Sequence, residues 1–265
     1  MSSQDNWTFG IIGGTGMLGS AIAHAVLNSG TITPDRMWVS NRSGQIEGLD
    51  GVSVTTDPQE LADACDVILL CVPPASTRTL RIKAETRLVL SVMAGVSLSA
   101  LHDLTGADRI VRAMSSPAAK QGLAYSPWCA SKGVTGQDRI VTRAIFEACG
   151  QTDEIQGDEA LIDVFTAMTG PVPGFVAFFA DAVAEFAEKS GVPAEIADRA
   201  VRQLFLGAGA LMANNEMTPA DHVKEMIDYA GTTAAGLEVM QSSDIKSDVS
   251  KALDAAVART RTIGL

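Results

Sequence analysis

Two different hydrophobic patterns divide the chain near residue 153. Before that point, short apolar runs bounded by glycine, proline or polar residues alternate with longer stretches of helical periodicity. This alternation predicts strands and helices that follow one another in a parallel α/β sheet. The runs that we expect to form strands are WTFGIIGG, RMWVSN, DVILLCVP, TRLVLSVMAG, RIVRAMSS and AYSPWCA.

From about residue 154 the strand pattern disappears, and long Ala, Leu, Val and Met segments with spaced charges continue to the end. Breaks at 169–174, 191–193 and 217–219 separate the predicted helices. Runs such as PGFVAFFADAVAEFA and LFLGAGALMA have too little polar face for a solvated helix, which predicts burial against a second copy of the chain. We therefore expect two domains, residues 1–153 and residues 154–265, and an obligate dimer.

Composition narrows the class of protein. The 265 residues are 46% hydrophobic, enough for one large core or two modest ones, and the formal charge of −11 argues against nucleic acid or an anionic membrane as partner. The four cysteines form no CxxC pair and the three histidines are scattered, so no metal site is expected. With no secretory signal and no run approaching a membrane span, we expect a cytoplasmic protein.

A glycine-rich loop follows the first predicted strand. The residues Gly14-Thr15-Gly16-Met17-Leu18-Gly19 form a G-x-G-x-x-G that opens a helix, and the glycines allow backbone N–H groups to approach a pyrophosphate. The position between strand and helix predicts dinucleotide binding by Gly14, Gly16, Met17, Leu18 and Gly19, although a merely tight structural turn is the alternative.

The end of the second predicted strand indicates which dinucleotide binds. NAD sites place an acid there on the ribose 2′-hydroxyl, but this chain has Ser40, Asn41, Arg42 and Ser43. A guanidinium among hydroxyl and amide donors suits a 2′-phosphate, so we expect NADPH, with NAD as the weaker alternative. A solvated polar turn would explain the same residues. The predicted fold class is thus α/β, a Rossmann-type NADP-binding domain followed by an all-α dimerisation domain.

Several motifs occur in an order that resembles the pyrroline-5-carboxylate reductase family over nearly the whole chain, and the GTTxxGL segment is the most specific of them. The resemblance implies a homodimer, or a higher homo-oligomer built from dimers, in which interlocking helical domains complete a site for a small cyclic imine. It also implies cofactor contacts from Cys71, Val72, Pro73, Ala94 and Gly95. The motifs are the glycine loop, Asn41–Ser43, Ser91–Gly95, Arg112–Pro117, Thr166–Gly170 and Gly231–Glu238.

The candidate substrate site lies at a predicted helix start. There, unpaired N–H groups of Gly231, Thr232 and Thr233 and the two threonine hydroxyls can hold a small anionic substrate without lysine or arginine. A threonine that only caps the helix is the alternative. Thr233, Thr232 and Thr169 are the catalytic candidates, and because an imine protonated in solution already attracts hydride, orientation would carry most of the catalysis.

Four turns depart from the family pattern, which has Val-Lys-Pro, Pro-Asn-Thr-Pro, Ser-Gly-Ser-Gly-Pro and Ser-Pro-Gly-Gly-Thr-Thr. Here Ser115 and Ser116, which we expect to contact substrate, precede Pro117 in place of the asparagine turn. Asp228 stands where the family has serine. We expect Asp228 to face the pocket and to disfavour a carboxylate substrate by charge repulsion. In the alternative, Asp228 points outward and caps the following helix, and the family substrate can still bind. The alternatives to pyrroline-5-carboxylate reduction are a paralogous imine reductase with another substrate and a non-catalytic NADP-binding dimer. The turns in this chain are Cys71-Val72-Pro73-Pro74, Ser115-Ser116-Pro117, Thr169-Gly170-Pro171-Val172-Pro173 and Asp228-Tyr229-Ala230-Gly231-Thr232-Thr233.

Overall fold

The computed structural model describes residues 7–170 and 173–263. The chain divides into two compact units, one of residues 1–172 with 255–265 and one of residues 173–254. This division differs from the expected boundary after residue 153, because helix α5 (Leu161–Thr169) and the end of α10 (Ile245–Ile263) pack with the sheet. Turn 169–174 was expected to separate two helices, and its residues 171 and 172 lie outside the described residues.

A seven-stranded sheet forms the centre of the first unit, in the order β3-β2-β1-β4-β5-β6-β8. The first six strands run parallel, and β8 is antiparallel to β6. The predicted runs all contain strands, but AYSPWCA splits into two, and the sequence analysis missed β3 and β9. The strands are β1 (Phe9–Ile12), β2 (Met37–Ser40), β3 (Ser53–Thr55), β4 (Val67–Leu70), β5 (Leu88–Ser91), β6 (Arg109–Ala113) and β8 (Trp128–Ala130), with β7 (Ala124–Tyr125) and β9 (Gly150–Gln151) paired separately.

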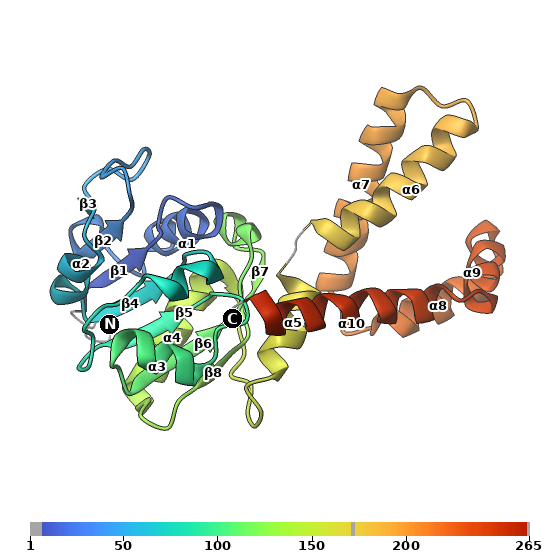
Figure 1. The fold of residues 1–265 in the computed structure, drawn as a ribbon. Helices are drawn as coiled ribbons and strands as arrows, with labels where there is room; N and C mark the ends of the chain where they lie inside the picture. The colour runs from blue at the N-terminus through green and yellow to red at the C-terminus, as the bar shows by residue number, and fades with distance from the viewer. Residues whose placement is uncertain (1–6, 171–172, 264–265) are drawn as a thin grey trace. The chain divides into compact units, whose positions relative to one another are not determined.

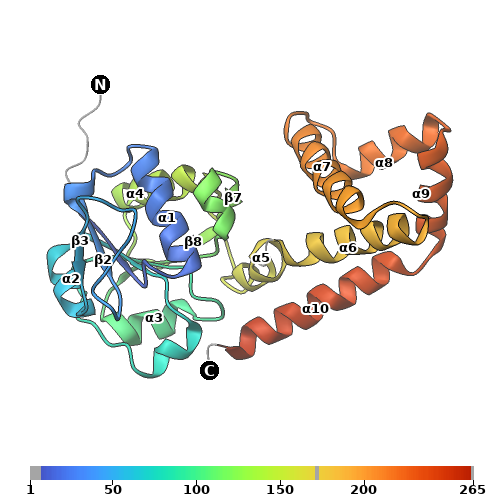
Figure 2. The ribbon, with the colours of Figure 1, turned by 90° about the horizontal axis from the view of Figure 1, so that it is seen from above.

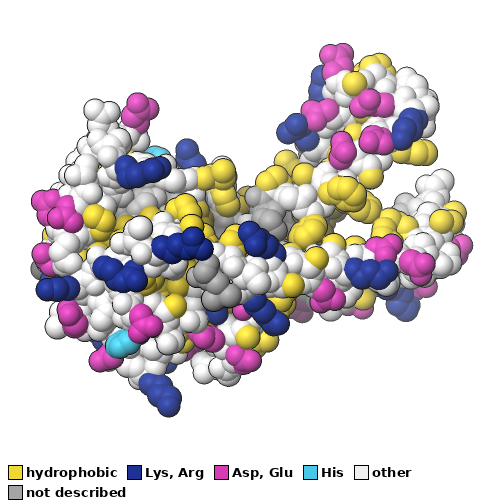
Figure 3. Space-filling view, viewed as in Figure 1, with side chains coloured by type: hydrophobic (Ala, Val, Ile, Leu, Met, Phe, Trp, Pro, Cys, Tyr) yellow, Lys and Arg dark blue, Asp and Glu magenta, His cyan; other side chains and the backbone are white. Residues whose placement is uncertain are grey.

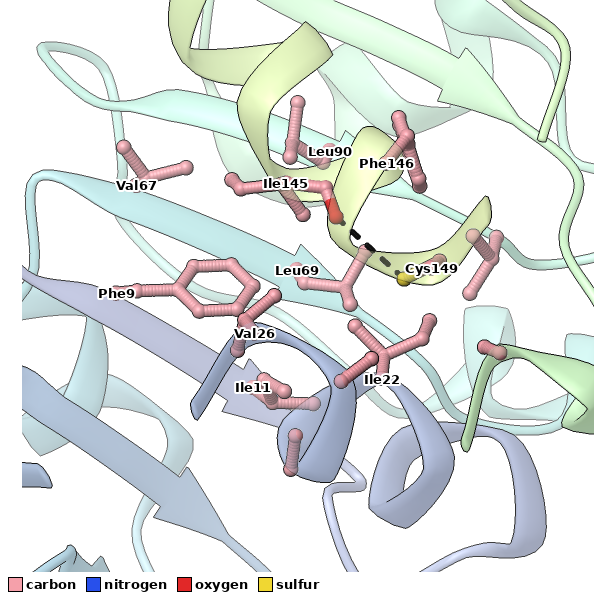
Figure 4. Packing of buried hydrophobic residues seen from close by; sticks show 14 of the residues in the cluster. Phe9, Ile11, Ile22, Val26, Val67, Leu69, Leu90, Ile145, Phe146 and Cys149 are labelled. Atoms are coloured by element: carbon pink, nitrogen blue, oxygen red, sulfur yellow. Dashed lines mark hydrogen bonds between the residues drawn. The ribbon is translucent and has the colours of Figure 1, made fainter. Parts of the chain in front are cut away.

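Helices cover both faces of this sheet (Figure 1 and Figure 2). The helices α1 (Met17–Asn28) and α4 (Gly136–Cys149) share one buried cluster with the strands, in which Ile22, Phe146 and Phe9 pack together (Figure 4). The helices α2 (Pro58–Ala64) and α3 (Leu98–Thr105) share the other cluster. Burial on both faces explains why the central strands are continuously apolar rather than alternating.

Strand order reverses direction at β1, which lies between β2 and β4. In a doubly wound sheet the crossover connections on either side of such a point leave opposite faces, which opens a crevice beyond the carboxyl ends of the strands. The fold therefore places a ligand crevice at the glycine loop.

The second unit consists of helices α6 (Gly174–Lys189), α7 (Ala194–Ala213), α8 (Pro219–Asp228) and α9 (Thr232–Ser242) with the first part of α10. The predicted breaks before α7 and α8 are confirmed, and in each case proline stands at the helix start. Large apolar side chains are exposed along α6 and α7, including Phe178 and Leu206, and α6 has no buried residue among those described (Figure 3). Such uncovered apolar helices are typical of surfaces that bind another protein.

The stretch Leu161–Lys189 is long and apolar enough to cross a membrane by length and composition alone, in contrast to the expectation from sequence. It runs over residues outside the description, and Asp163 within it takes part in a buried ion pair of the first unit. Burial against another protein surface accounts for the same apolar composition.

Candidate functional site

A cavity of about 760 Å³ opens beyond the carboxyl ends of β1, β2 and β4. It brings together seven of the residues that the sequence assigned to the cofactor: Gly16, Ser40, Asn41, Arg42, Cys71, Val72 and Pro73. It also contains residues that the sequence analysis missed. Gly13 is one of them, and the others include four residues whose side-chain hydroxyl groups were the available signal: Thr15, Thr56, Ser76 and Thr79.

The glycine loop leaves no room for a side chain at three of its glycines, Gly13, Gly14 and Gly19. A Cβ on Gly13, which has φ +89°, would overlap the carbonyl oxygen of Cys71, and one on Gly19 would overlap that of Gly13. A Cβ on Gly14 would lie 2.7 Å from a methyl group of Val39. Helix α1 then begins at Met17 with Gly16 as its N-cap and no side-chain capping bond, so its first N–H groups can receive a pyrophosphate. A dinucleotide fits this cradle.

The loop after β2 is shaped by Asn41. Its side-chain nitrogen donates to the carbonyl of Gln45 (2.8 Å), and its side-chain oxygen accepts from the backbone N–H groups of Ser43 (3.0 Å) and Gly44 (2.7 Å). The Ser43 hydroxyl donates to the same oxygen. Asn41 and Ser43 therefore fold the loop, and exposed Arg42 remains as the cation that this cavity offers to a 2′-phosphate.

Cys71 lines the cavity as a neutral side chain. Burial raises the pKa of its thiol to about 12, so the thiolate is scarce near neutral pH. A thiol with that pKa is a weak nucleophile and a poor redox group. Its contribution here is an apolar wall, and its carbonyl packs on Gly13.

A second cavity, of about 370 Å³, adjoins the first at Val72, which lines both. Two predicted cofactor residues, Leu18 and Ala94, line it, as does the predicted substrate residue Ser115. Most of its wall is apolar. Such a wall suits a nicotinamide ring because it excludes water from the site of hydride transfer. Other lining residues, which the sequence analysis did not assign, are Pro74, Val92, Met93, Met114, Pro117, Thr166 and Gly170.

Several predicted residues also have contacts within the first unit. The Ser115 hydroxyl shares a 2.9 Å hydrogen bond with Ser126, and Ser116 is buried. Gly95 has φ +71°, and a Cβ there would overlap the carbonyl oxygen of Thr260 on α10. Gly95 is thus explained by helix packing. Thr169, proposed as catalytic, donates its hydroxyl to the carbonyl of Phe165 in its own helix (2.9 Å).

The predicted substrate residues Gly231, Thr232 and Thr233 meet at the start of α9 in the second unit. Gly231 is the N-cap and makes no side-chain capping bond, so the alternative in which a threonine only caps the helix is wrong. The two threonines are exposed on the first turn. Their hydroxyls have no hydrogen-bond partner within the part of the chain that the structure describes, which leaves them available to a ligand.

The turn before α9 contradicts one of the two expectations for Asp228, the one in which it caps α9. Asp228 is the last residue of α8 and accepts a hydrogen bond from the Lys224 ammonium (2.6 Å), so it does not cap α9. Ala230 has φ +55°, a left-handed conformation that glycine adopts more easily. The exposed ring of Tyr229 lies against Gly231, where a Cβ would be 3.3 Å from the ring.

Comparison with known proteins identifies the family. Residues 159–263 match the family model "Pyrroline-5-carboxylate reductase dimerisation", and residues 8–95 match "NADP oxidoreductase coenzyme F420-dependent". A pyrroline-5-carboxylate reductase of Synechocystis sp. is 31% identical over 263 residues, covering 96% of this chain and 97% of the relative. The chain belongs to the pyrroline-5-carboxylate reductase family. It is an NAD(P)H-dependent oxidoreductase that acts on a C=N bond.

Solved structures agree with this assignment. A pyrroline-5-carboxylate reductase from Coxiella burnetii has a TM-score of 0.85 at 25% identity, with 98% of this chain and 100% of that chain covered. The fold is also that of a Plasmodium falciparum pyrroline carboxylate reductase with NADP bound (TM-score 0.82, 23% identity, 98% and 99% covered). The matched dimerisation model supports a homo-oligomer and explains the uncovered apolar helices.

Proposed function

We propose that the protein reduces pyrroline-5-carboxylate to proline with NADPH. The observation that carries the proposal is the start of α9, where Gly231, Thr232 and Thr233 offer uncommitted donors in a chain that also has a dinucleotide cavity. A bound nicotinamide would supply the hydride. The family membership and the relatives' printed activity support this substrate.

The residues of the first unit would bind and orient the cofactor. The glycine loop and the start of α1 would hold the pyrophosphate. Arg42 would pair with the 2′-phosphate, because residues 40–43 at the end of β2 include no acid that would select NAD. The apolar cavity around Met93 and Met114 would hold the ring and exclude water from it.

The residues of the second unit would bind the substrate. A carboxylate accepts hydrogen bonds from the first N–H groups of a helix and is favoured by the helix dipole. The hydroxyls of Thr232 and Thr233 would add to these contacts. With the imine protonated from solvent, alignment rather than a strong acid or base would accelerate hydride transfer.

We further propose that the oligomer is a homodimer, or is built from dimers, through the apolar faces of α6 and α7. A second copy would cover side chains such as Phe178, Phe186 and Leu206, which a lone subunit leaves in water. The cytoplasmic location stays a prediction.

The test is NADPH oxidation by the purified protein with pyrroline-5-carboxylate and with a panel of neutral and carboxylated cyclic imines, each repeated with NADH. We expect pyrroline-5-carboxylate with NADPH to give the highest kcat/KM. A higher value for an uncharged imine would favour a different substrate, as the altered turn at Asp228 and Tyr229 allows. Tight NADPH binding without oxidation by any imine would refute the catalytic proposal.

A further inference from the structure

A cluster of charged side chains lies within the first unit, beside the apolar cavity. Asp163 of α5 accepts a hydrogen bond from the Arg112 guanidinium of β6, and its other oxygen lies 3.9 Å from Arg261 Nε of α10. Arg112 also donates to the backbone carbonyl of Glu159 (3.3 Å). The side chains of Arg112 and Asp163 are 5% and 9% exposed. Burying such a pair is costly, so stability alone is a weak reason for its presence.

The cluster joins two segments that line the apolar cavity. Helix α5 carries Asp163 and, one turn later, Thr166, which lines the cavity. Strand β6 carries Arg112 and leads into Met114 and Ser115, which line it from the other side. The Arg112–Asp163 bond therefore fixes the separation of two walls.

The same cluster holds the loop after β5, whose residues Val92, Met93 and Ala94 form a third wall. The Glu159 carboxylate lies 3.9 Å from Arg112 and accepts a hydrogen bond from the backbone N–H of Leu98 (3.0 Å), the first residue of α3.

Nearer the wall residues, Gly95 packs on the carbonyl of Thr260, the neighbour of Arg261. The loop is thus held beside the charged cluster at two points after Ala94, at Gly95 and at Leu98.

We propose that Asp163 is a positioning residue for hydride transfer, which acts by holding Arg112 and Arg261 and through them the cavity walls. The reaction itself rests on the proposed function. The residues around Arg42 that would bind the adenosine phosphates line the other cavity, so loss of Asp163 would loosen the nicotinamide end and spare cofactor affinity. Displacements of about 1 Å at a reacting centre can cost about 100-fold in rate.

The test uses Asp163→Asn, which keeps the side-chain shape and removes the charge. We expect kcat to fall about tenfold while KM for NADPH changes by less than about twofold. Arg261→Ala removes an exposed partner at the longer distance and should lower kcat about two- to threefold. Arg259→Ala, two residues earlier on the same helix and also exposed, is the matched control and should leave kcat unchanged.

A second measurement requires no imine. The fluorescence anisotropy of the reduced nicotinamide in bound NADPH reports the mobility of the ring, and Asp163→Asn should lower it at unchanged NADPH affinity. If the wild-type protein reduces no imine, the proposed reaction fails but the anisotropy still decides the role of Asp163. If Asp163→Asn does not fold, Arg261→Ala decides. The proposal would be overturned if the variants that fold kept the anisotropy and kcat of the wild type. It would also be overturned if they lost only affinity for NADPH.

Discussion

Replacement of Arg42 by alanine should weaken NADPH binding by about 10- to 100-fold and change NADH binding little. Asn41 and Ser43 use their side chains to fold the loop, so Arg42 would supply the charged contact to the 2′-phosphate in the proposed NADPH complex. A hydrogen bond to a charged group contributes about 1.5 to 3 kcal/mol, and each 1.4 kcal/mol is about tenfold in affinity. The chain as a whole carries a net charge of −11, so its overall field offers no compensation for a lost cation.

The assay is titration of both cofactors by fluorescence, together with steady-state kinetics. Arg42 is exposed, so the variant should keep its fold. Arg143→Ala on α4, which removes an exposed arginine outside both cavities, is the matched control. Gly13→Ala gives the opposite pattern, because a methyl group against the Cys71 carbonyl should weaken both cofactors equally. Equal losses of NADPH and NADH in Arg42→Ala would refute the assignment of Arg42 to the phosphate.

Three further predictions follow from the second unit and the buried thiols. Asp228→Ser should raise kcat/KM for pyrroline-5-carboxylate by about threefold or less, because Lys224 already pairs with this carboxylate. A gain of about tenfold in steady-state assays would show that Asp228 faces the substrate. Ala230→Gly should raise the free energy of unfolding in urea by about 0.5 to 1 kcal/mol. Glycine adopts the left-handed conformation at φ +55° without strain, and this gain exceeds the entropy that glycine adds to the unfolded chain. A lower free energy of unfolding in the variant would show that Ala230 is not strained. Burial raises the pKa of the Cys149 thiol to about 12 from an ordinary 9.0, so the thiol ionises at lower pH in the unfolded chain, and the free energy of unfolding should fall as pH rises from about 9 towards 12. In urea unfolding, Cys149→Ala should show a shallower fall with pH. The same pH dependence in the variant and the wild type would contradict this linkage.

The sequence by itself determined the features that reside in one continuous segment. Apolar runs between turn residues located the strands of the parallel sheet, and the glycine loop with Arg42 located the dinucleotide cavity. Proline after polar turns located the starts of α7 and α8. Each of these signals depends on the local backbone, which residues within one or two turns control.

The sequence analysis failed where local signals were too short or where partners come from distant segments. Strand β3 has three residues, too few to show a period, and the antiparallel direction of β8 depends on its pairing with β6. The capping alternative for Asp228 failed for a different reason, because Lys224 lies one turn earlier on the same helix and takes its carboxylate.

Only the tertiary structure showed which residues of distant segments meet around the apolar cavity. The cofactor contact of Gly95 stays a prediction, and the structure adds that the carbonyl of Thr260, far along the chain, excludes a side chain there. Asp163 carried no motif of its own, and its partners Arg112 and Arg261 lie on a strand and on the last helix. Such contacts depend on how separate elements pack, and local periodicity encodes which face of an element is buried but not which distant residue it meets.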